Sequence, residues 1–392
     1  MDLYENYTED ASNGTDSSTE KIGTALNYSV LYNVISVVIN VVIFVGGLVG
    51  NILVILVVIR TRSMRTPTNC YLISLAVADC ILLMSATLPA IPETFFQINE
   101  WPFGRVMCSL LVFLQYLGID ISSLSITAFT VERYIAICHP LRSQRMCTVE
   151  RANRIIVGIW IFGILYCSPW LGLTTVKQER RHDTVVNLCI YLLDRENYVI
   201  YYMTDLIIFY IIPLLISAIL YGLIARMMFK TNITQEDAGI SLNAKRNRNR
   251  QMSSRLQVVR MLAVIVFVFM VTWMPYRTMV VYNSIATEKY LDLWFLMFSR
   301  TMVYINSAIN PILYNAMSVK FRRAFKRILC CGKYLVDGHT SVYSEVNLEN
   351  VVLKSRRPTT ESTIQLQLHF NGRNTSVRNE SNRFNDNRAT SQ

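Results

Sequence analysis

Long blocks of hydrophobic residues, separated by short polar connections, dominate the chain up to about Phe321. Seven blocks are recognisable, near residues 31–60, 69–97, 105–138, 153–175, 198–229, 256–284 and 293–316. Each is long enough to cross a bilayer as an α-helix, which takes about 20 residues. Their apolar residues do not alternate strictly with polar ones, which argues against β-barrel strands. The pattern predicts an all-α membrane protein, a bundle of seven transmembrane helices.

The polar segments around these blocks divide the chain into four parts. We expect an extracellular N-terminal segment over residues 1–29 and the seven-helix domain over residues 30–317. Residues 318–331 are basic and amphipathic, which predicts a short helix on the membrane surface. Residues 332–392 are rich in Asn, Ser, Thr and Arg, and we expect them to form a disordered cytoplasmic tail.

Charge gives the expected orientation. The chain has 392 residues, of which 52% are hydrophobic and 17% charged, too apolar for an ordinary soluble protein of its size. The net charge of +11 comes from Lys and Arg in alternate connections, which indicates that these face the cytoplasm and that the N-terminus is extracellular. Because the basic residues flank membrane spans, membrane lipid rather than nucleic acid is the expected partner. The expected location is the plasma membrane.

Several positions are candidates for covalent modification. Cys108 and Cys189 are the cysteines in expected extracellular positions, where an oxidising environment would let them pair. Cys330 and Cys331 follow the amphipathic segment and suit palmitoylation, although they could also be ordinary exposed thiols. The N-terminal segment carries three acceptor patterns for N-linked glycans, at Asn6, Asn13 and Asn27.

Polar residues inside the hydrophobic blocks are costly, and each is therefore a candidate for function. Asp79 lies near the middle of the second block. One carboxylate with several neutral oxygens could hold a sodium ion, and a hydrogen-bonded packing network with water is the alternative. No other cofactor is expected. The candidate partners of Asp79 are Asn51, Ser122, Asn306, Ser307 and Asn310.

Prolines interrupt three of the blocks, at Pro213, Pro275 and Pro311. Proline removes a backbone donor and weakens the helix locally, so these helices can bend. Neighbouring helices can satisfy the freed groups inside a bundle. Three such points would permit the helix ends to tilt as rigid bodies, as a conformational switch requires.

Taken together, these motifs resemble those of the rhodopsin-type G-protein-coupled receptors, from about residue 30 to residue 330. The motifs are Asn51, the Leu-Ala-Val-Ala-Asp that ends at Asp79, Glu132-Arg133-Tyr134, Trp160, Pro213 with Tyr221, Trp273-x-Pro275 and Asn310-Pro311-x-x-Tyr314. Two positions depart slightly from the family pattern: Thr272 stands where many members have cysteine, and Glu132 replaces the commoner aspartate. The resemblance implies that Glu132 holds Arg133 at rest, and that Arg133 meets Tyr221, Tyr314 and the G protein on activation. The residues expected to form the switch are Glu132, Arg133, Tyr134, Tyr221, Phe269, Trp273, Pro275, Asn310, Pro311 and Tyr314.

Within that family the chain is most similar to the thyrotropin-releasing hormone receptor group. The segments that carry this similarity include 65–72, 115–119, 125–130, 273–278 and 314–318. The group binds a short peptide blocked at both ends, and the resemblance places the ligand residues at Tyr116, Asp120, Tyr276 and Arg300. Asp120 replaces an asparagine, so an amide becomes a carboxylate that only accepts hydrogen bonds when ionised. Asp205 and Arg277 are further candidates, with structural ion pairs as the alternative reading.

The resemblance implies a receptor for a small neuropeptide that signals through a Gq-class heterotrimeric G protein, phospholipase C and calcium. It also implies arrestin and receptor kinases as partners. A receptor for a different amidated neuropeptide is the main alternative, because of Asp120. A secondary transporter could also carry mid-membrane charges, but the sequence lacks the paired repeats of transporters. No enzyme is expected, since no nucleophile, base and orienting acid occur together.

Overall fold

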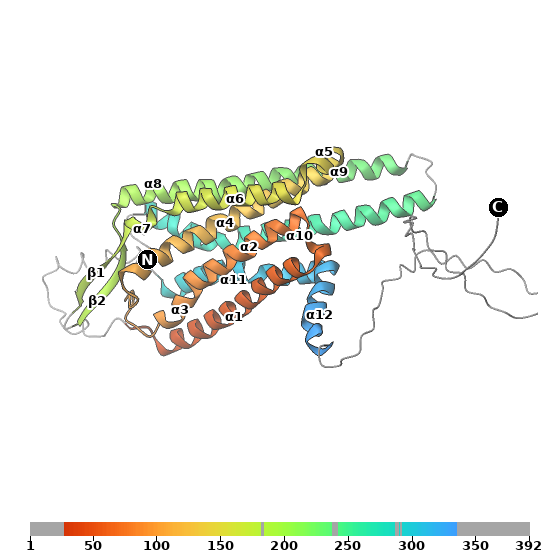
Figure 1. The fold of residues 1–392 in the computed structure, drawn as a ribbon. Helices are drawn as coiled ribbons and strands as arrows, with labels where there is room; N and C mark the ends of the chain where they lie inside the picture. The colour runs from red at the N-terminus through yellow and green to blue at the C-terminus, as the bar shows by residue number, and fades with distance from the viewer. Residues whose placement is uncertain (1–26, 182–183, 237–241, 287–289, 291, 335–392) are drawn as a thin grey trace, which may run out of the picture. The chain divides into compact units, whose positions relative to one another are not determined.

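The computed structural model describes residues 27–181, 184–236, 242–286, 290 and 292–334. Seven long helical segments form its core, and they run side by side along one axis (Figure 1). Their bounds are α1 (Val30–Arg60), α2 (Pro67–Leu82) with η2 (Leu83–Thr87) and α3 (Leu88–Glu93), α4 (Gly104–Cys138), α6 (Val149–Cys167), α8 (Arg195–Leu206) with η3 (Ile207–Ile211) and α9 (Ile212–Glu236), α10 (Leu242–Ile285), and α11 (Leu293–Met317). The predicted seven-helix bundle is confirmed.

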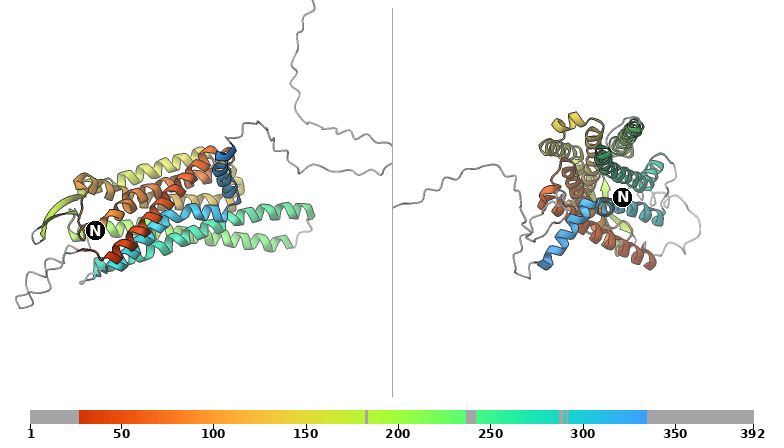
Figure 2. Two further views of the ribbon diagram at one scale, coloured as in Figure 1. Left: turned by 90° about the horizontal axis from the view of Figure 1, so that it is seen from below. Right: turned by 90° about the vertical axis from the view of Figure 1, so that its right-hand side faces the viewer.

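Shorter elements complete the bundle at its two ends (Figure 2). One end, here called the hairpin end, carries the strands β1 (Thr174–Arg181) and β2 (Thr184–Tyr191). The other, here called the α12 end, carries α12 (Val319–Tyr334), which runs across the bundle axis (Figure 1). The remaining short helices are η1 (Arg62–Met64), α5 (Pro140–Met146) and α7 (Trp170–Leu173).

Capping residues define where several helices begin. The hydroxyl groups of Ser29, Thr66 and Thr148 each accept a hydrogen bond from the backbone N–H three residues later, at the starts of α1, α2 and α6. Asp292 caps α11 through its carboxylate, which accepts from Phe295 N at 2.6 Å. Pro67 occupies the first position of α2, where its missing N–H has no helical partner to lose. The caps of α1, α2 and α6 explain why these helices begin a few residues before the predicted hydrophobic blocks.

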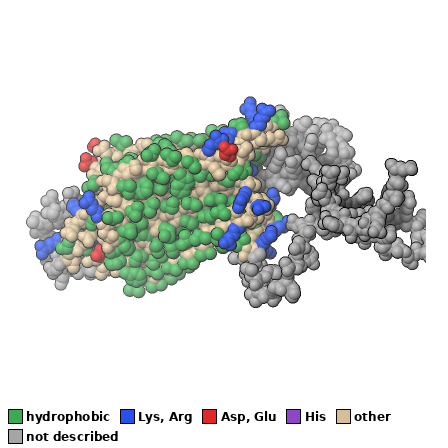
Figure 3. All heavy atoms as spheres, viewed as in Figure 1, with side chains coloured by type: hydrophobic (Ala, Val, Ile, Leu, Met, Phe, Trp, Pro, Cys, Tyr) green, Lys and Arg blue, Asp and Glu red, His purple; other side chains and the backbone are tan. Residues whose placement is uncertain are grey.

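The face of the bundle seen in Figure 3 is hydrophobic over its middle, and charged side chains gather at its two ends. Six helical segments in the described residues are long and apolar enough to cross a membrane. The seventh, α11, contains Arg300 and two buried asparagines, Asn306 and Asn310, and is less apolar. A belt of exposed valine, leucine and isoleucine around a partly polar interior is the arrangement expected of a membrane protein.

The predicted amphipathic helix after the seventh span is α12. Phe321, Ala324 and Phe325 are buried against the bundle, and Phe321 packs on Tyr314 of α11 with ring centroids 5.7 Å apart. Arg322, Arg323, Lys326 and Arg327 point to the exposed side. This two-faced pattern fits a helix lying on a membrane surface.

The two-stranded hairpin was not foreseen from the sequence. Its strands pair antiparallel from Thr174 opposite Tyr191 to Arg181 opposite Thr184. The Cys108–Cys189 disulfide joins β2 to the start of α4, as predicted, with the two Cα atoms 5.7 Å apart.

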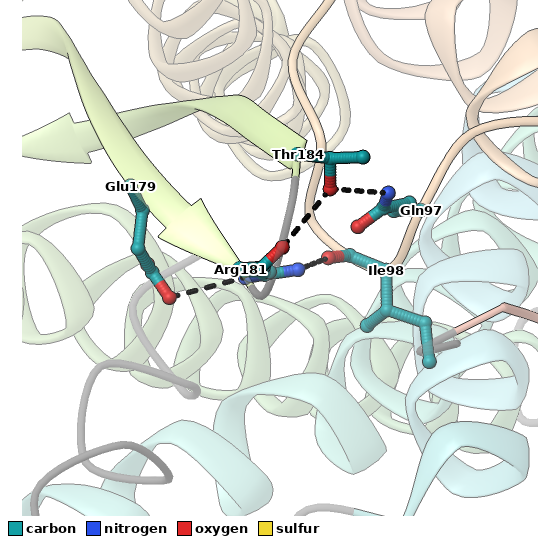
Figure 4. A network of polar contacts seen from close by, with 5 residues as sticks. All are labelled: Gln97, Ile98, Glu179, Arg181 and Thr184. Carbon is teal, nitrogen blue, oxygen red and sulfur yellow. Dashed lines mark hydrogen bonds and ion pairs between the residues drawn. The ribbon is translucent and has the colours of Figure 1, made fainter. Parts of the chain in front are cut away.

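A second attachment holds the tip of the hairpin (Figure 4). The Arg181 Nη1 donates to the backbone oxygen of Ile98 at 2.8 Å, and its Nε lies 3.3 Å from the Glu179 carboxylate. Thr184 Oγ1 accepts from the amide of Gln97 at 3.4 Å and donates to Arg181 O at 3.1 Å. The hairpin is therefore fixed at both the disulfide and the loop that follows α3.

Candidate functional site

A cavity lies inside the hairpin end of the bundle. Its empty volume is about 1080 Å³, counting the part open to solvent. Residues from η2, α3, the loop before α4, α4, β2, α10 and α11 line it, and most of them are apolar or aromatic. Its polar side chains include Glu93, Gln115, Tyr276 and Arg300. An apolar cavity with a few convergent polar groups is typical of a site for a small ligand.

An ion pair joins two helices at this cavity. Arg300 Nη1 of α11 lies 3.3 Å and 3.5 Å from the two carboxylate oxygens of Glu93, at the end of α3. The side chains of Arg300 and Glu93 are 27% and 31% exposed, so both remain accessible. The pair presents a hydrogen-bond donor and an acceptor next to each other, with no net charge.

The deep part of the cavity reaches the predicted switch. Trp273 lines the cavity and packs on Phe269, with ring centroids 6.0 Å apart. Phe269 in turn packs on Tyr210 of η3 at 5.9 Å. Pro275 follows Trp273 within α10, where it removes one helical hydrogen bond. A ligand that pressed on Trp273 would therefore act next to the weakest point of α10.

Tyr116 takes part in an aromatic stack instead of lining the cavity. Its ring stacks on Trp170 of α7, with centroids 4.6 Å apart and an interplanar angle of 14°. Tyr191, which does line the cavity, meets Trp170 edge-on at 5.2 Å. The stack connects the wall of the cavity to α4 through two aromatic contacts.

Asp120, Asp205 and Arg277 form a separate buried cluster. Arg277 Nη1 donates to Asp205 Oδ2 at 2.9 Å, and Cys167 Sγ donates to Asp120 Oδ2 at 3.2 Å. The Arg277 guanidinium also lies 5.1 Å from the Trp273 ring centroid, within the range of a cation–π contact. Asp120 and Asp205 are fully buried, and none of the three charged residues lines the cavity.

Asp79 occupies the centre of the bundle, where it accepts two hydrogen bonds. Asn310 Nδ2 of α11 donates to its Oδ2 at 2.8 Å, and Ser122 Oγ of α4 donates to its Oδ1 at 3.2 Å. Asn51 links α1 to the same region by donating to the backbone oxygen of Ser307 at 2.9 Å. Asn306 and Ser307 are also buried. Asn310 and Ser122 therefore meet Asp79 through direct hydrogen bonds, and Asn51 bonds to the α11 backbone at Ser307.

A second cavity lies at the α12 end, with an empty volume of about 1740 Å³ that includes open solvent. Glu132, Arg133 and Cys147 are among the residues that line it. Arg133 Nη2 lies 3.9 Å from Glu132 Oε1, the pairing that the resemblance implies for the resting state. Burial, followed by a hydrogen bond to Glu132, raises the pKa of the Cys147 thiol to about 11.

The two tyrosines expected to meet Arg133 are engaged elsewhere or unpaired. Tyr221 lies 3.5 Å from Thr130 Oγ1, a distance at the limit for a hydrogen bond. In the part of the chain that the structure describes, the buried Tyr314 hydroxyl has no hydrogen-bond partner. Tyr134 packs edge-on against His139 at 5.5 Å.

Apart from Tyr116, which lies in the aromatic stack, the structure divides the predicted ligand residues into two groups. Tyr276 and Arg300 share the cavity, whereas Asp120, Asp205 and Arg277 share the buried cluster. Two important residues were missed from the sequence, Glu93 and Cys167. Glu93 could have been predicted as a site residue, because it is an acidic residue at the end of the second hydrophobic block. No feature of the sequence indicated a role for Cys167.

The predicted modification sites are only partly described. Asn27 is exposed and forms a β-bridge with Gln97. Asn6 and Asn13 lie outside the described residues, and Cys330 and Cys331 are described only as backbone positions of α12.

Comparisons with known proteins agree with this geometry. Residues 50–314 match the family model described as 7 transmembrane receptor (rhodopsin family). The chain is 44% identical to the thyrotropin-releasing hormone receptor of Bos taurus over 326 residues, which cover 79% of this chain and 81% of the relative. The receptors of the same name from Homo sapiens and Gallus gallus are 45% and 46% identical over 296 residues, covering 71% of this chain and 74% of each relative.

Proposed function

The chain belongs to the rhodopsin family of seven-transmembrane receptors, and on that premise we propose that it is a receptor for a small neuropeptide similar to thyrotropin-releasing hormone. It is a multi-pass receptor of the plasma membrane and not an enzyme. The sequence identity of 44–46% to thyrotropin-releasing hormone receptors supports the ligand class most strongly. The cavity at the hairpin end, with its neutral Arg300–Glu93 pair, supports a small ligand that carries both hydrogen-bond donors and acceptors.

We propose that the hairpin end faces the outside of the cell. The Cys108–Cys189 disulfide lies at that end, and disulfides persist in oxidising compartments. Lysine and arginine residues of α12, such as Arg322 and Lys326, lie at the opposite end, as the positive-inside rule expects of a cytoplasmic face. This orientation places the N-terminus outside, where Asn27 would be accessible for glycosylation.

The proposed intracellular partner is a heterotrimeric G protein of the Gq class, which would lead to phospholipase C activation and calcium release. The cavity at the α12 end contains Arg133 and would receive this partner when α10 moves outward. Arrestin and receptor kinases are proposed as later partners on the same face. Palmitoylation of Cys330 and Cys331 would hold α12 against the inner leaflet.

A sodium ion is proposed as an allosteric modulator at Asp79. The donor set fits: one buried carboxylate with the hydroxyl oxygens of Ser122 and Ser307 near it, in the interior of the bundle. Hard cations prefer such oxygen ligands. Binding there would compete with the hydrogen bond from Asn310 and would stabilise the arrangement of α2, α4 and α11 that forms the site.

A receptor for a different amidated neuropeptide remains the second candidate. The observation that favours it is Asp120, which stands where the thyrotropin-releasing hormone receptor group has asparagine. A carboxylate in place of an amide changes which groups the site can bind, if the ligand approaches the buried cluster.

A calcium-release screen tests the proposed function. Cells expressing the chain would be treated with a library of amidated short peptides, including thyrotropin-releasing hormone, and untransfected cells would serve as the control. We expect at least one amidated peptide to release calcium only in cells that express the chain. Absence of any response, with the receptor detected at the cell surface, would contradict a Gq-coupled peptide receptor.

A further inference from the structure

The buried cluster of Asp120, Asp205 and Arg277 has more acids than bases. Both carboxyl groups are fully buried, and the one guanidinium among them is 5% exposed. If both acids were ionised, the cluster would carry a net negative charge in the interior of a membrane protein. An uncompensated buried charge is strongly unfavourable, so a further positive charge or a proton is needed.

The hydrogen bonds leave one oxygen of each acid unpaired. Asp205 Oδ2 accepts from Arg277 at 2.9 Å, and Asp120 Oδ2 accepts from the Cys167 thiol at 3.2 Å. Within the described residues, Oδ1 of each aspartate has no conventional donor. Asp120 and Asp205 lie at the same level of α4 and α8, since one turn further along Ser123 Oγ donates to the backbone oxygen of Phe209. Two neighbouring buried carboxylates repel, whereas a single proton between them forms an O–H···O bond.

No other positive charge is available among the described groups that face Asp120. From α6 these are Cys167 and the phenol of Tyr166, and from α8 they are Asp205 and the phenol of Tyr201. From α10 the only such group is Arg277, whose guanidinium already pairs with Asp205 and lies over the Tyr202 ring at 5.4 Å. The surroundings therefore supply one cation for two acids.

We propose that Asp120 and Asp205 form a proton-binding site in which a single proton, held on Asp120, is shared with the Asp205 carboxylate. One proton and one guanidinium make the cluster neutral. A protonated Asp120 donates one hydrogen bond and accepts another, as an asparagine amide does. The site connects α4, α8 and α10 beside Trp273, and its existence does not depend on which ligand or G protein the receptor uses.

The sign of the pH effect follows from proton counting. Aspartate in the unfolded chain ionises near pH 4, so it holds no proton at neutral pH. The folded protein, with its shared proton, binds more protons than the unfolded chain. Stability must then fall as the pH rises from the range in which unfolded aspartate ionises to the range in which the folded site loses its proton, and level off above that range.

Thermal unfolding of the purified full-length receptor in detergent tests this pH dependence. The unfolding is monitored by tryptophan fluorescence at pH values from roughly 6 to 9. We expect the Tm of the parent to fall with pH by roughly 2 °C per unit while the folded site holds its proton, and to level off once the proton leaves. Asp120→Asn should remove that slope, because its amide donates to Asp205 at every pH. Asp292→Asn, the same change at an exposed helix cap, should keep the parent slope. Equal slopes in the parent and Asp120→Asn would overturn the proposal.

Infrared spectroscopy provides a second measurement that does not require Asp120→Asn to fold. The parent should show the carbonyl band of a protonated carboxyl group that is lost at high pH. Asp120→Glu should shift that band while keeping a carboxyl group in place. If no such band responds to either pH or this substitution, Asp120 carries no proton and the proposal fails.

Discussion

The Arg300 guanidinium lies 3.3 Å from the Glu93 carboxylate, and both side chains line the cavity at the hairpin end. The two residues are 207 positions apart in the chain, so the pair ties α11 to the end of α3. A neighbouring donor and acceptor with no net charge can bind a neutral amide, which offers one carbonyl and one N–H. A free carboxylate would be attracted by Arg300 but repelled by Glu93.

We therefore expect Glu93→Gln to reduce the preference for amidated peptides. Without the Glu93 charge, Arg300 should attract a free carboxylate more strongly. The potency ratio of an amidated peptide to its free-acid form should fall about fivefold, equivalent to ~1 kcal/mol for a partly exposed pair. Calcium dose-response curves for both peptide forms measure this. Glu100→Gln removes another carboxylate from the same cavity lining and should leave the ratio unchanged. An unchanged ratio in Glu93→Gln would show that the pair does not select the ligand terminus.

Two adjacent glycines in α1 should respond very differently to alanine. A Cβ at Gly47 would lie 2.8 Å from Ala308 Cβ and 3.1 Å from Ala308 Cα, so α1 and α11 would have to separate. Gly47→Ala should destabilise the receptor by about 1–3 kcal/mol, a typical cost of overpacking. Gly46 has no atom within 4 Å of such a Cβ, and Gly46→Ala should keep the parent Tm. Equal Tm values for the two variants would mean that α1 and α11 are less closely packed than described.

Removal of the Asp205 carboxylate should strongly destabilise the folded receptor, because the buried Arg277 would lose its ionised partner. Asp205→Ala should lose about 3–5 kcal/mol, which would show as a lower Tm and reduced surface expression. Joint replacement by Asp205→Leu and Arg277→Met should recover much of this loss, since no buried charge then remains.

Glu150→Ala provides the control for this prediction. It breaks the ion pair with Arg154, in which the Arg154 and Glu150 side chains are 74% and 84% exposed, and should have little effect on Tm. If Asp205→Ala proved as mild as Glu150→Ala, the Arg277 pair would not be a structural ion pair.

The sodium proposal predicts that Asp79 makes agonist binding sensitive to sodium. Raising sodium at constant ionic strength should weaken agonist binding to the parent, because the ion stabilises the resting arrangement. Asp79→Asn should bind agonist with the same affinity at all sodium concentrations. Agonist competition binding with potassium as the replacement ion measures this. An equal effect of sodium on both proteins would exclude Asp79 as the site.

Much of the fold follows from local pattern. The first block was predicted at residues 31–60 and α1 spans Val30–Arg60, because an uninterrupted apolar run bounded by a serine cap and basic residues leaves little choice. The sixth span extends further than predicted, since α10 begins at Leu242 with polar residues that a hydrophobicity pattern cannot include. The hairpin was not predicted, because β1 contains Lys177, Glu179 and Arg180 and resembles a polar loop.

The candidate site was less predictable, because its contacts join distant parts of the chain. Tyr276 and Arg300 could be named from family resemblance, but their position beside Glu93 depends on how α3 and α11 pack. The sequence left open whether Asp205 and Arg277 bind ligand or form structural ion pairs. In the structure Arg277 pairs with Asp205, and Asp120 accepts from Cys167.

Parallel measurements of peptide binding and calcium release test the central claim most directly, namely that a ligand at the hairpin end controls a switch at the α12 end. Surface binding of a labelled agonist peptide and calcium release would be compared for the parent, Arg300→Gln and Arg133→Ala. Arg300→Gln should lose both binding and response, because Arg300 lines the cavity. Arg133→Ala should retain binding and lose calcium release, because Arg133 lies in the cavity at the opposite end. Normal calcium release by Arg133→Ala, or parent-like binding by Arg300→Gln, would contradict this account.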